Sequence, residues 1–231
     1  MPDWTPTLGA IVYGPATTFR VWAPERTLVE VVQYVGAGFS RTIDPLTRDE
    51  RGYWSDRFEG VLPGARYKYR LDRDDRSVFP DPASRSQPDG VHGPSMVVDP
   101  SRFTWTDQAW TPPSLRDLSL YELHVGTFTP DGTFRAATER LPHLVQLGVT
   151  ALELMPVGDF PGTRNWDYDG VAIFAPARCY GEPDDLRALV DAAHRHGLAL
   201  FLDVIYNHLG PDGAYANAFS PYYFASAHRT A

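Results

Sequence analysis

The stretch of sequence that decides the fold lies near the C-terminus and reads LALFLDVIYNH, residues 198–208. It leads from an apolar run into a polar group formed by Asp203, Asn207 and His208. A continuous apolar run is typical of a strand that is buried on both faces of a parallel sheet. Functional side chains of βα proteins gather where such strands end, because they leave the packed core there. The stretch therefore predicts a strand over 198–205 that ends in a functional site.

Two more apolar segments, 118–125 and 150–155, predict two further strands of the same sheet. Between them, 133–147 has helical spacing that Pro142 interrupts, so we expect a short helix and then a second one that begins near Pro142. Gly148 follows as the expected end of this second helix.

A longer helix is expected between the second and third strands. Pro183 stands at its first turn and Gly197 just beyond its last turn. The preceding segment, 156–181, is expected to be a long loop. Three apolar strands joined by helices predict a parallel sheet with right-handed crossovers.

The first part of the chain has short alternating or β-branched segments that Gly and Pro separate. We expect a turn at Pro63-Gly64, an ordered surface loop over 80–94 and an edge strand at Val97-Val98. This pattern favours an antiparallel, immunoglobulin-like β-sandwich. We place the domain boundary in the segment 110–114, giving domains 1–112 and 113–231. The expected strands of the sandwich are 18–23, 28–34, 53–58 and 66–71.

Composition narrows the class of protein. The 231 residues include 21 Lys and Arg against 29 Asp and Glu, a net charge of -8, which argues against nucleic acid or an anionic membrane as a partner. The single Cys179 excludes an intrachain disulfide framework and fits a reducing compartment. The sequence from Met1 has no signal-peptide pattern, and no run approaches the roughly 18 apolar residues of a membrane span. We therefore expect a cytoplasmic protein without membrane contact.

Several chemistries lack their motifs in this sequence. Phosphate-binding glycine loops, Cys-x-x-Cys pairs, His-x-x-x-His pairs and the Gly-x-Ser-x-Gly elbow are all absent. No cofactor or metal is expected. The remaining hypothesis is carboxylate chemistry on a sugar, which the aromatic content of 13% suits.

Polar and aromatic side chains at the expected strand ends have two interpretations each. Asp203 either orients a cation or bonds substrate, or it caps a loop, and the functional interpretation is favoured. Asn207 and His208 either bind sugar or cap a turn. Trp166 and Tyr168 share a face in extended geometry and form either an aromatic wall or the packing of a long loop; Tyr168 is interpreted as functional and Trp166 is left open.

Other conspicuous side chains are interpreted as structural. Glu122 and His124 share one strand face and are expected to be buried with hydrogen-bond partners. The aromatic residues of the sandwich are expected to fill its core rather than to form a glycan platform. They are Trp22, Tyr34, Trp54, Tyr67 and Tyr69.

The segment DVIYNH, 203–208, resembles the first conserved region of the α-amylase superfamily of glycoside hydrolases. The segments 122–134 (ELHVGTFTPDGTF) and 160–170 (FPGTRNWDYDG) resemble the malto-oligosyltrehalose trehalohydrolases of that superfamily, and 19–24 with 80–82 resembles their N-terminal sandwich. The likeness covers essentially the whole chain. Glycogen branching enzymes share the layout and are the alternative. The resemblance implies a TIM (β/α)8 barrel, of which this chain holds the first three βα units.

The resemblance also implies an activity and roles for residues. The activity is retaining hydrolysis of the α-1,4 bond next to the terminal trehalose of malto-oligosyltrehalose, so the expected substrate is this compound or a malto-oligosaccharide. Tyr168 would stack on the sugar, His208 would hydrogen-bond its hydroxymethyl group, and Asp203 would position an arginine beside the nucleophile. Asn207 and Asp169 would support them. Asp167 stands where relatives usually have Gly, which adds a charge beside Tyr168.

In the family, the nucleophilic Asp follows strand four, the acid/base Glu follows strand five and a third acid follows strand seven. We therefore expect the chain to be a partial enzyme that lacks these groups, needs the rest of its barrel and is inactive alone. A hypothesis of another class is a non-catalytic α-glucan-binding fragment that uses the sandwich aromatics and the loop of Trp166 and Tyr168. Titration with maltoheptaose tests that alternative.

Overall fold

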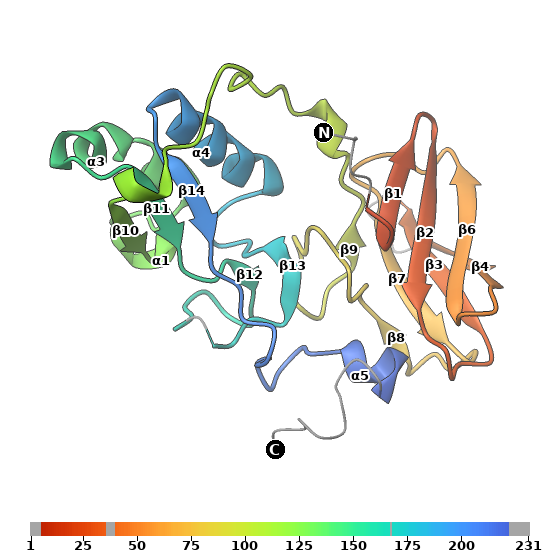
Figure 1. The fold of residues 1–231 in the computed structure, drawn as a ribbon. Helices are drawn as coiled ribbons and strands as arrows, with labels where there is room; N and C mark the ends of the chain where they lie inside the picture. Colours follow the sequence, from red (N-terminus) through yellow and green to blue (C-terminus); the bar gives the residue numbers. More distant parts are fainter. Residues whose placement is uncertain (1–5, 36–39, 167, 222–231) are drawn as a thin grey trace. The chain divides into compact units, whose positions relative to one another are not determined.

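The computed structural model describes residues 6–35, 40–166 and 168–221, which fall into two compact units (Figure 1). The first unit spans Met1–Asp99 together with Gly213–Ala231, and the second spans Pro100–Asp212. The chain therefore returns to its first unit after it has built the second.

The first unit is the expected β-sandwich. One sheet has the strand order β1-β2-β6-β5 and the other β4-β3-β7-β8, with β9 also paired to β7; all neighbours are antiparallel. The strands are β1 (Gly9–Tyr13), β2 (Ala16–Trp22), β3 (Val29–Val35), β4 (Ser40–Pro45), β5 (Thr47–Arg48), β6 (Tyr53–Glu59), β7 (Arg66–Leu71), β8 (Val78–Phe79) and β9 (Ser95–Met96). The edge strand expected at Val97-Val98 is thus found two residues earlier.

Alternation along the strands builds the sandwich core. In β2, Phe19 and Val21 point inward, since alternate side chains of a strand face opposite sides of the sheet. The ring of Phe19 packs 4.7 Å, centroid to centroid, from Tyr67 of the other sheet. The core interpretation is confirmed for Trp54, Tyr67 and Tyr69, which are at most 5% exposed, whereas Trp22 and Tyr34 are half-buried.

The loop expected over 80–94 is ordered by buried polar contacts. Asp81 is 3% exposed and accepts hydrogen bonds from the Tyr67 hydroxyl at 2.6 Å and the Ala83 amide at 2.8 Å. Removal of the carboxyl from water raises the pKa of Asp81 to about 6. This loop therefore rests on a carboxyl group that burial biases toward its protonated form.

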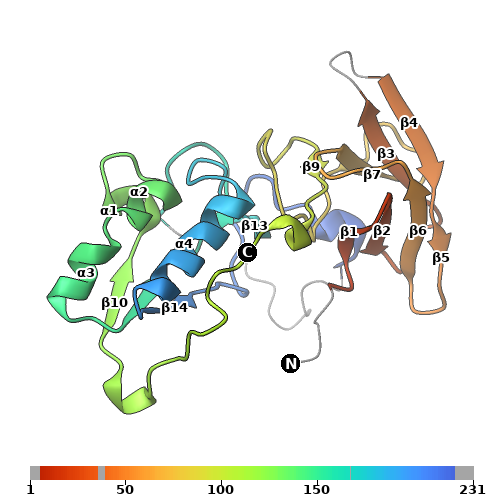
Figure 2. The same cartoon turned by 90° about the horizontal axis from the view of Figure 1, so that it is seen from above.

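The second unit is built on a parallel sheet of β10 (Leu120–Leu123), β11 (Ala151–Leu154) and β14 (Ala199–Leu202), in that order. The helices include α1 (Val125–Phe128), α2 (Phe134–Thr138), α3 (Leu141–Leu147) and α4 (Pro183–Arg195), and Figure 2 shows α2, α3 and α4 around β10 and β14. Leucines of the strands and helices fill the core between them. These are the first three βα units of a barrel, and the described residues form no closed barrel.

The helix predictions are confirmed and two strand predictions change. The expected break near Pro142 separates α2 from α3, and Gly148 ends α3 in a left-handed conformation, φ 89°. The third strand stops at Leu202 rather than at Ile205, because its partner β11 ends at Leu154. The Leu154 carbonyl accepts a hydrogen bond from the Asp203 amide. The expected loop 156–181 contains a hairpin of β12 (Gly158–Asp159) and β13 (Ala172–Pro176).

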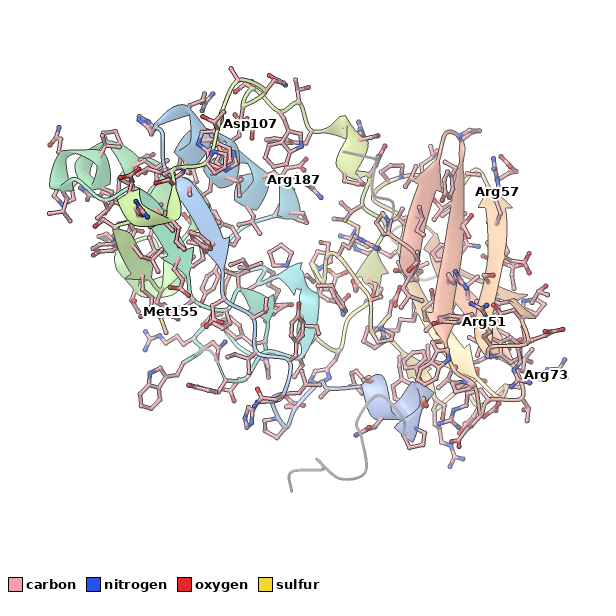
Figure 3. All side chains as sticks on the ribbon, viewed as in Figure 1. Arg51, Arg57, Arg73, Asp107, Met155 and Arg187 are labelled. Atoms are coloured by element: carbon pink, nitrogen blue, oxygen red, sulfur yellow. The ribbon has the colours of Figure 1, made fainter. Side chains whose placement is uncertain are left out.

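The observed division into units differs from the boundary expected at 112/113. The difference concerns two segments, 100–112 and 213–221. Residues 100–112, which begin with a 3-10 turn at Pro100–Arg102, belong to the second unit. Asp107 (labelled in Figure 3) contacts His194 of α4 at 2.6 Å, and the ring of Trp110 stacks on that imidazole at 3.8 Å. The helix α5 (Ala216–Phe219) belongs to the first unit.

No helix among the described residues has both the length and the hydrophobicity to cross a membrane. A further 3-10 turn, Leu115–Asp117, precedes β10.

We predict that Asp81→Asn flattens the pH dependence of stability. An unfolded Asp has a pKa near 3.9, and the folded value is about 6, so the folded state retains a proton that the unfolded state has lost. This contribution to stability is complete below the unfolded pKa and is lost as the pH rises through the folded pKa. The free energy of unfolding, measured by urea titration, should lose about 2 kcal/mol more between pH 4 and pH 7 in the original protein than in the variant.

The control for that titration is Asp75→Asn, which removes an exposed carboxylate that pairs with Arg70. Identical pH profiles for the Asp81 variant and the original protein would contradict a raised pKa at Asp81.

Candidate functional site

A buried ion pair fixes the hairpin from which the candidate site extends. Asp159 in β12 is fully buried, and its carboxylate accepts a hydrogen bond from Arg178 at 2.9 Å. Burial raises the pKa of Asp159, and the Arg178 charge opposes that shift. The same guanidinium donates to the carbonyls of Phe160 and Gly162 at 3.0 and 2.8 Å. One arginine therefore closes the beginning of the loop 160–170 onto the hairpin.

Asn165 fixes the far part of that loop. Its carbonyl oxygen lies 3.1 Å from Nε2 of His124, which also contacts the Tyr180 hydroxyl at 3.3 Å. The side-chain oxygen of Asn165 accepts the Asp169 amide at 3.2 Å. His124 is half-buried and has hydrogen-bond partners, whereas Glu122, which was expected to be buried with it, is exposed. The bonds of His124 hold the turn that carries Tyr168.

The loop 160–170 meets the segment after β14 at Gly210. The Gly210 amide donates to the Gly170 carbonyl at 3.2 Å. A Cβ at position 210 would lie 2.5 Å from the Asp169 carbonyl oxygen, closer than any such atom is found. The two loops can therefore approach this closely because residue 210 is a glycine.

This approach brings Tyr168 and His208 together. Their ring centroids are 6.0 Å apart and the rings are nearly perpendicular, at 83°. Tyr168 is 59% exposed and His208 is also exposed. An aromatic ring and an imidazole are thus presented to solvent side by side, the first suited to the apolar face of a sugar and the second to a hydroxyl group.

A small pocket lies beside His208, which is one of its lining residues. It encloses about 40 Å³, which is room for a few water molecules or hydroxyl groups rather than for a pyranose ring. Its lining combines the segment after β11, the end of β14 and both loops. Met155, which directly follows β11 and precedes the first lining residue, is labelled in Figure 3. The lining residues are Pro156, Val157, Gly158, Asn165, Gly170, Ile173, Leu202, Asp203, Val204, Ile205, Tyr206 and His208.

The predicted site residues divide into two sets. Asp203 and His208 line the pocket, and Tyr168 contacts His208. Asp169 belongs to the loop that meets Gly210. Trp166 is 86% exposed and Asn207 is exposed, and neither is among the described lining residues; Asp167 lies outside the described residues.

Sequence analysis did not single out two contributors to this geometry, the Asp159–Arg178 pair and Gly210. Asn165, which belongs to the motif 160–170, lines the pocket. Its Nδ2 atom is buried and has no hydrogen-bond partner among the described atoms. Within the described residues, no group of three His, Cys, Asp or Glu side chains is placed to hold a metal ion.

Two family models match the chain. Residues 77–222 match the alpha amylase catalytic domain, and residues 7–85 match carbohydrate-binding module 48, the isoamylase N-terminal domain. The first match covers the whole candidate site and the second covers most of the sandwich.

Individual relatives and solved structures of the same family are similar to this chain. Malto-oligosyltrehalose trehalohydrolase of Deinococcus radiodurans is 48% identical over 91% of this chain, which corresponds to 34% of the relative. The branching enzyme GlgB of Rhodospirillum rubrum is 31% identical over 85% of the chain and 28% of the relative. A pullulanase of Anoxybacillus sp. LM18-11, crystallised with maltotetraose, superposes with a TM-score of 0.82 at 26% identity, over 97% of this chain and 39% of the pullulanase. The chain spans about a third of the length of the curated trehalohydrolases it matches.

We predict that Gly210→Ala destabilises the protein, because the added methyl group overlaps the Asp169 carbonyl. The expected loss in the free energy of unfolding is about 1 to 3 kcal/mol by urea denaturation. The matched control is Gly170→Ala, on the opposite loop, where the added Cβ would meet its nearest neighbour at 3.7 Å. That variant should change the free energy by less than about 0.5 kcal/mol. Equal effects of the two substitutions would contradict the close approach.

Proposed function

This chain belongs to the α-amylase family of glycoside hydrolases, and we propose that the protein that contains it hydrolyses the α-1,4 bond next to the terminal trehalose of malto-oligosyltrehalose. The observation that supports this most is the pairing of Tyr168 with His208, which lines the pocket at the strand ends. It gives a sugar ring an apolar face and a hydrogen-bonding group at one place.

The proposed binding mode follows from the size of the pocket. A pyranose ring is too large for a space of about 40 Å³, so the ring lies across the mouth, against the exposed face of Tyr168. An imidazole nitrogen of His208 hydrogen-bonds the hydroxymethyl group. Asp203, at the end of β14, orients an arginine beside the nucleophile.

The bond-breaking groups in this proposal come from other parts of the barrel. A retaining glycosidase needs two carboxyl groups about 5 to 5.5 Å apart, one as nucleophile and one as acid/base. The family resemblance puts them after strands four and five, whereas this chain holds strands one to three. The residues of this chain therefore bind and orient the sugar, and cleavage requires the whole barrel. We also propose a cytoplasmic location, which the lone Cys179 suits.

Incubation of the full-length protein with malto-oligosyltrehalose tests the activity. Release of trehalose, detected by chromatography, is the expected result. The alternative favoured by the 31% identical relative is glucan branching. Transfer of glucan chains to new branch points without trehalose release would replace the proposal with that activity.

We predict that His208→Ala in the full-length protein lowers kcat/KM by about 5- to 150-fold, which corresponds to about 1 to 3 kcal/mol for a hydrogen bond in a desolvated site. His143→Ala is the matched control, because it removes an exposed imidazole from α3. Unchanged kinetics of the His208 variant would refute a substrate contact at this residue.

A further inference from the structure

His124 stands where the first strand of the parallel sheet leads toward the candidate site. β10 ends at Leu123, and His124 is the residue between that strand and α1. Its imidazole is half-buried, and its side chain makes no capping hydrogen bond to α1. The helix that follows therefore does not account for the imidazole.

The contacts of the ring indicate where its proton lies. Nε2 lies 3.1 Å from the Asn165 carbonyl oxygen, which has lone pairs but no proton. A hydrogen bond between these atoms requires that Nε2 carries a proton and donates it. Nδ1 lies 3.3 Å from the Thr127 hydroxyl, which can donate to a bare ring nitrogen. The geometry thus fits an imidazole that donates from Nε2 and accepts at Nδ1.

Aromatic side chains of the core hold the ring in this orientation. Tyr180 is 3% exposed, and its ring meets the imidazole edge-on, with centroids 5.9 Å apart. Tyr180 in turn packs on Phe134 and Phe160, at 5.9 and 5.8 Å between centroids. A Cβ at Gly126 would lie 2.9 Å from the Tyr180 ring and 3.0 Å from the His124 ring. Because the imidazole has so little room, its donor stays aimed at one acceptor.

That acceptor belongs to the turn that carries Tyr168. The side-chain oxygen of Asn165 accepts the Asp169 amide at 3.2 Å, so the residue that His124 holds also closes the turn. Trp166 is 86% exposed, so burial of its indole does not hold the turn. His124 therefore fixes the turn on the N-terminal side of Tyr168.

We propose that His124 is a positioning residue for the sugar site: by donating from Nε2 to the Asn165 carbonyl, it holds Tyr168 where the ring can stack on substrate. His124 does not touch the sugar in this account. A loop that is held in its binding conformation loses less conformational freedom when ligand binds, so affinity rises without an added contact. The effect on affinity rests on the proposed function, whereas the effect on the turn does not.

The simpler alternative is that the imidazole only fills space beside Tyr180. Both accounts allow a loss of stability when the ring is removed, so stability does not separate them. They differ in whether a donor at the position of Nε2 matters. The amide nitrogen of a Gln side chain reaches about as far as Nε2, whereas that of Asn reaches only as far as Nδ1.

The experiment compares His124→Asn with His124→Gln in the full-length protein. Asn is favoured at the position before a helix, so the first variant should fold. Hydrogen–deuterium exchange at the Asp169 amide should become about tenfold faster in His124→Asn, as expected for the loss of one hydrogen bond, and stay within about twofold in His124→Gln. The Ala177 amide, which bonds to Val157 beside the hairpin, should exchange as in the original protein. Equal exchange at Asp169 in the two variants would overturn the positioning role.

The position of the proton is tested by nitrogen-15 spectra of the full-length protein labelled at histidine. His124→Gln identifies the resonances of this ring, because they disappear in that variant. A protonated Nε2 is expected. A ring that is protonated at Nδ1 alone could not donate to the Asn165 carbonyl, and that result would contradict the proposal.

The kinetic arm uses whichever α-glucan the full-length protein cleaves. KM is expected to rise about three- to tenfold in His124→Asn, with kcat changed less than about twofold, and to rise less in His124→Gln. His196→Asn is the matched control, because it removes an exposed imidazole at the end of α4 and should leave KM unchanged.

Two outcomes separate this inference from the proposed function. Faster exchange at Asp169 in His124→Asn with an unchanged KM would refute the role of His124 in sugar binding. Absence of trehalose release would refute the proposed substrate and leave the exchange and the spectra to decide how His124 acts on the turn.

Discussion

The close approach of Gly210 to the carbonyl of Asp169 is the constraint on which the candidate site depends. Two loops that follow different strands meet there, backbone to backbone, and a side chain at residue 210 would hold them apart. The contact between Tyr168 and His208 is a consequence of that approach. A sugar-binding surface needs both an apolar face and a hydrogen-bonding group, and this geometry supplies them from separate loops.

Each loop reaches the meeting point from a rigid support. The Asp159–Arg178 pair and the His124–Asn165 contact fix the first loop to the hairpin and to the end of β10. The second loop leaves the parallel sheet at Asp203 and reaches the sandwich at α5. Mobile loops lose conformational freedom when ligand binds, whereas supported loops have lost it on folding. The parallel sheet and the hairpin thus serve the candidate site by limiting the motion of two short segments.

Much of this architecture could be predicted from local sequence patterns. The apolar runs predicted three parallel strands, and Pro142 and Gly148 predicted a helix break and a helix end. The predictions that failed concern segments whose partners lie far away in the sequence. Arg178 closes the hairpin inside 156–181, and Phe219 packs among strands more than a hundred residues earlier. Periodicity reports burial of a segment but not what buries it. The motif around Tyr168 and His208 predicted both side chains, while their proximity required Gly210; their roles in binding stay predictions.

A crystal structure of the full-length protein with a bound malto-oligosaccharide would test the central claim most directly. The account predicts a glucose ring stacked on Tyr168 across the mouth of the pocket, with a hydroxyl group within hydrogen-bond distance of His208. It also predicts that the backbone contact between Gly210 and Gly170 is retained with the sugar in place. Sugar rings bound elsewhere, with Tyr168 and His208 left in solvent, would contradict it.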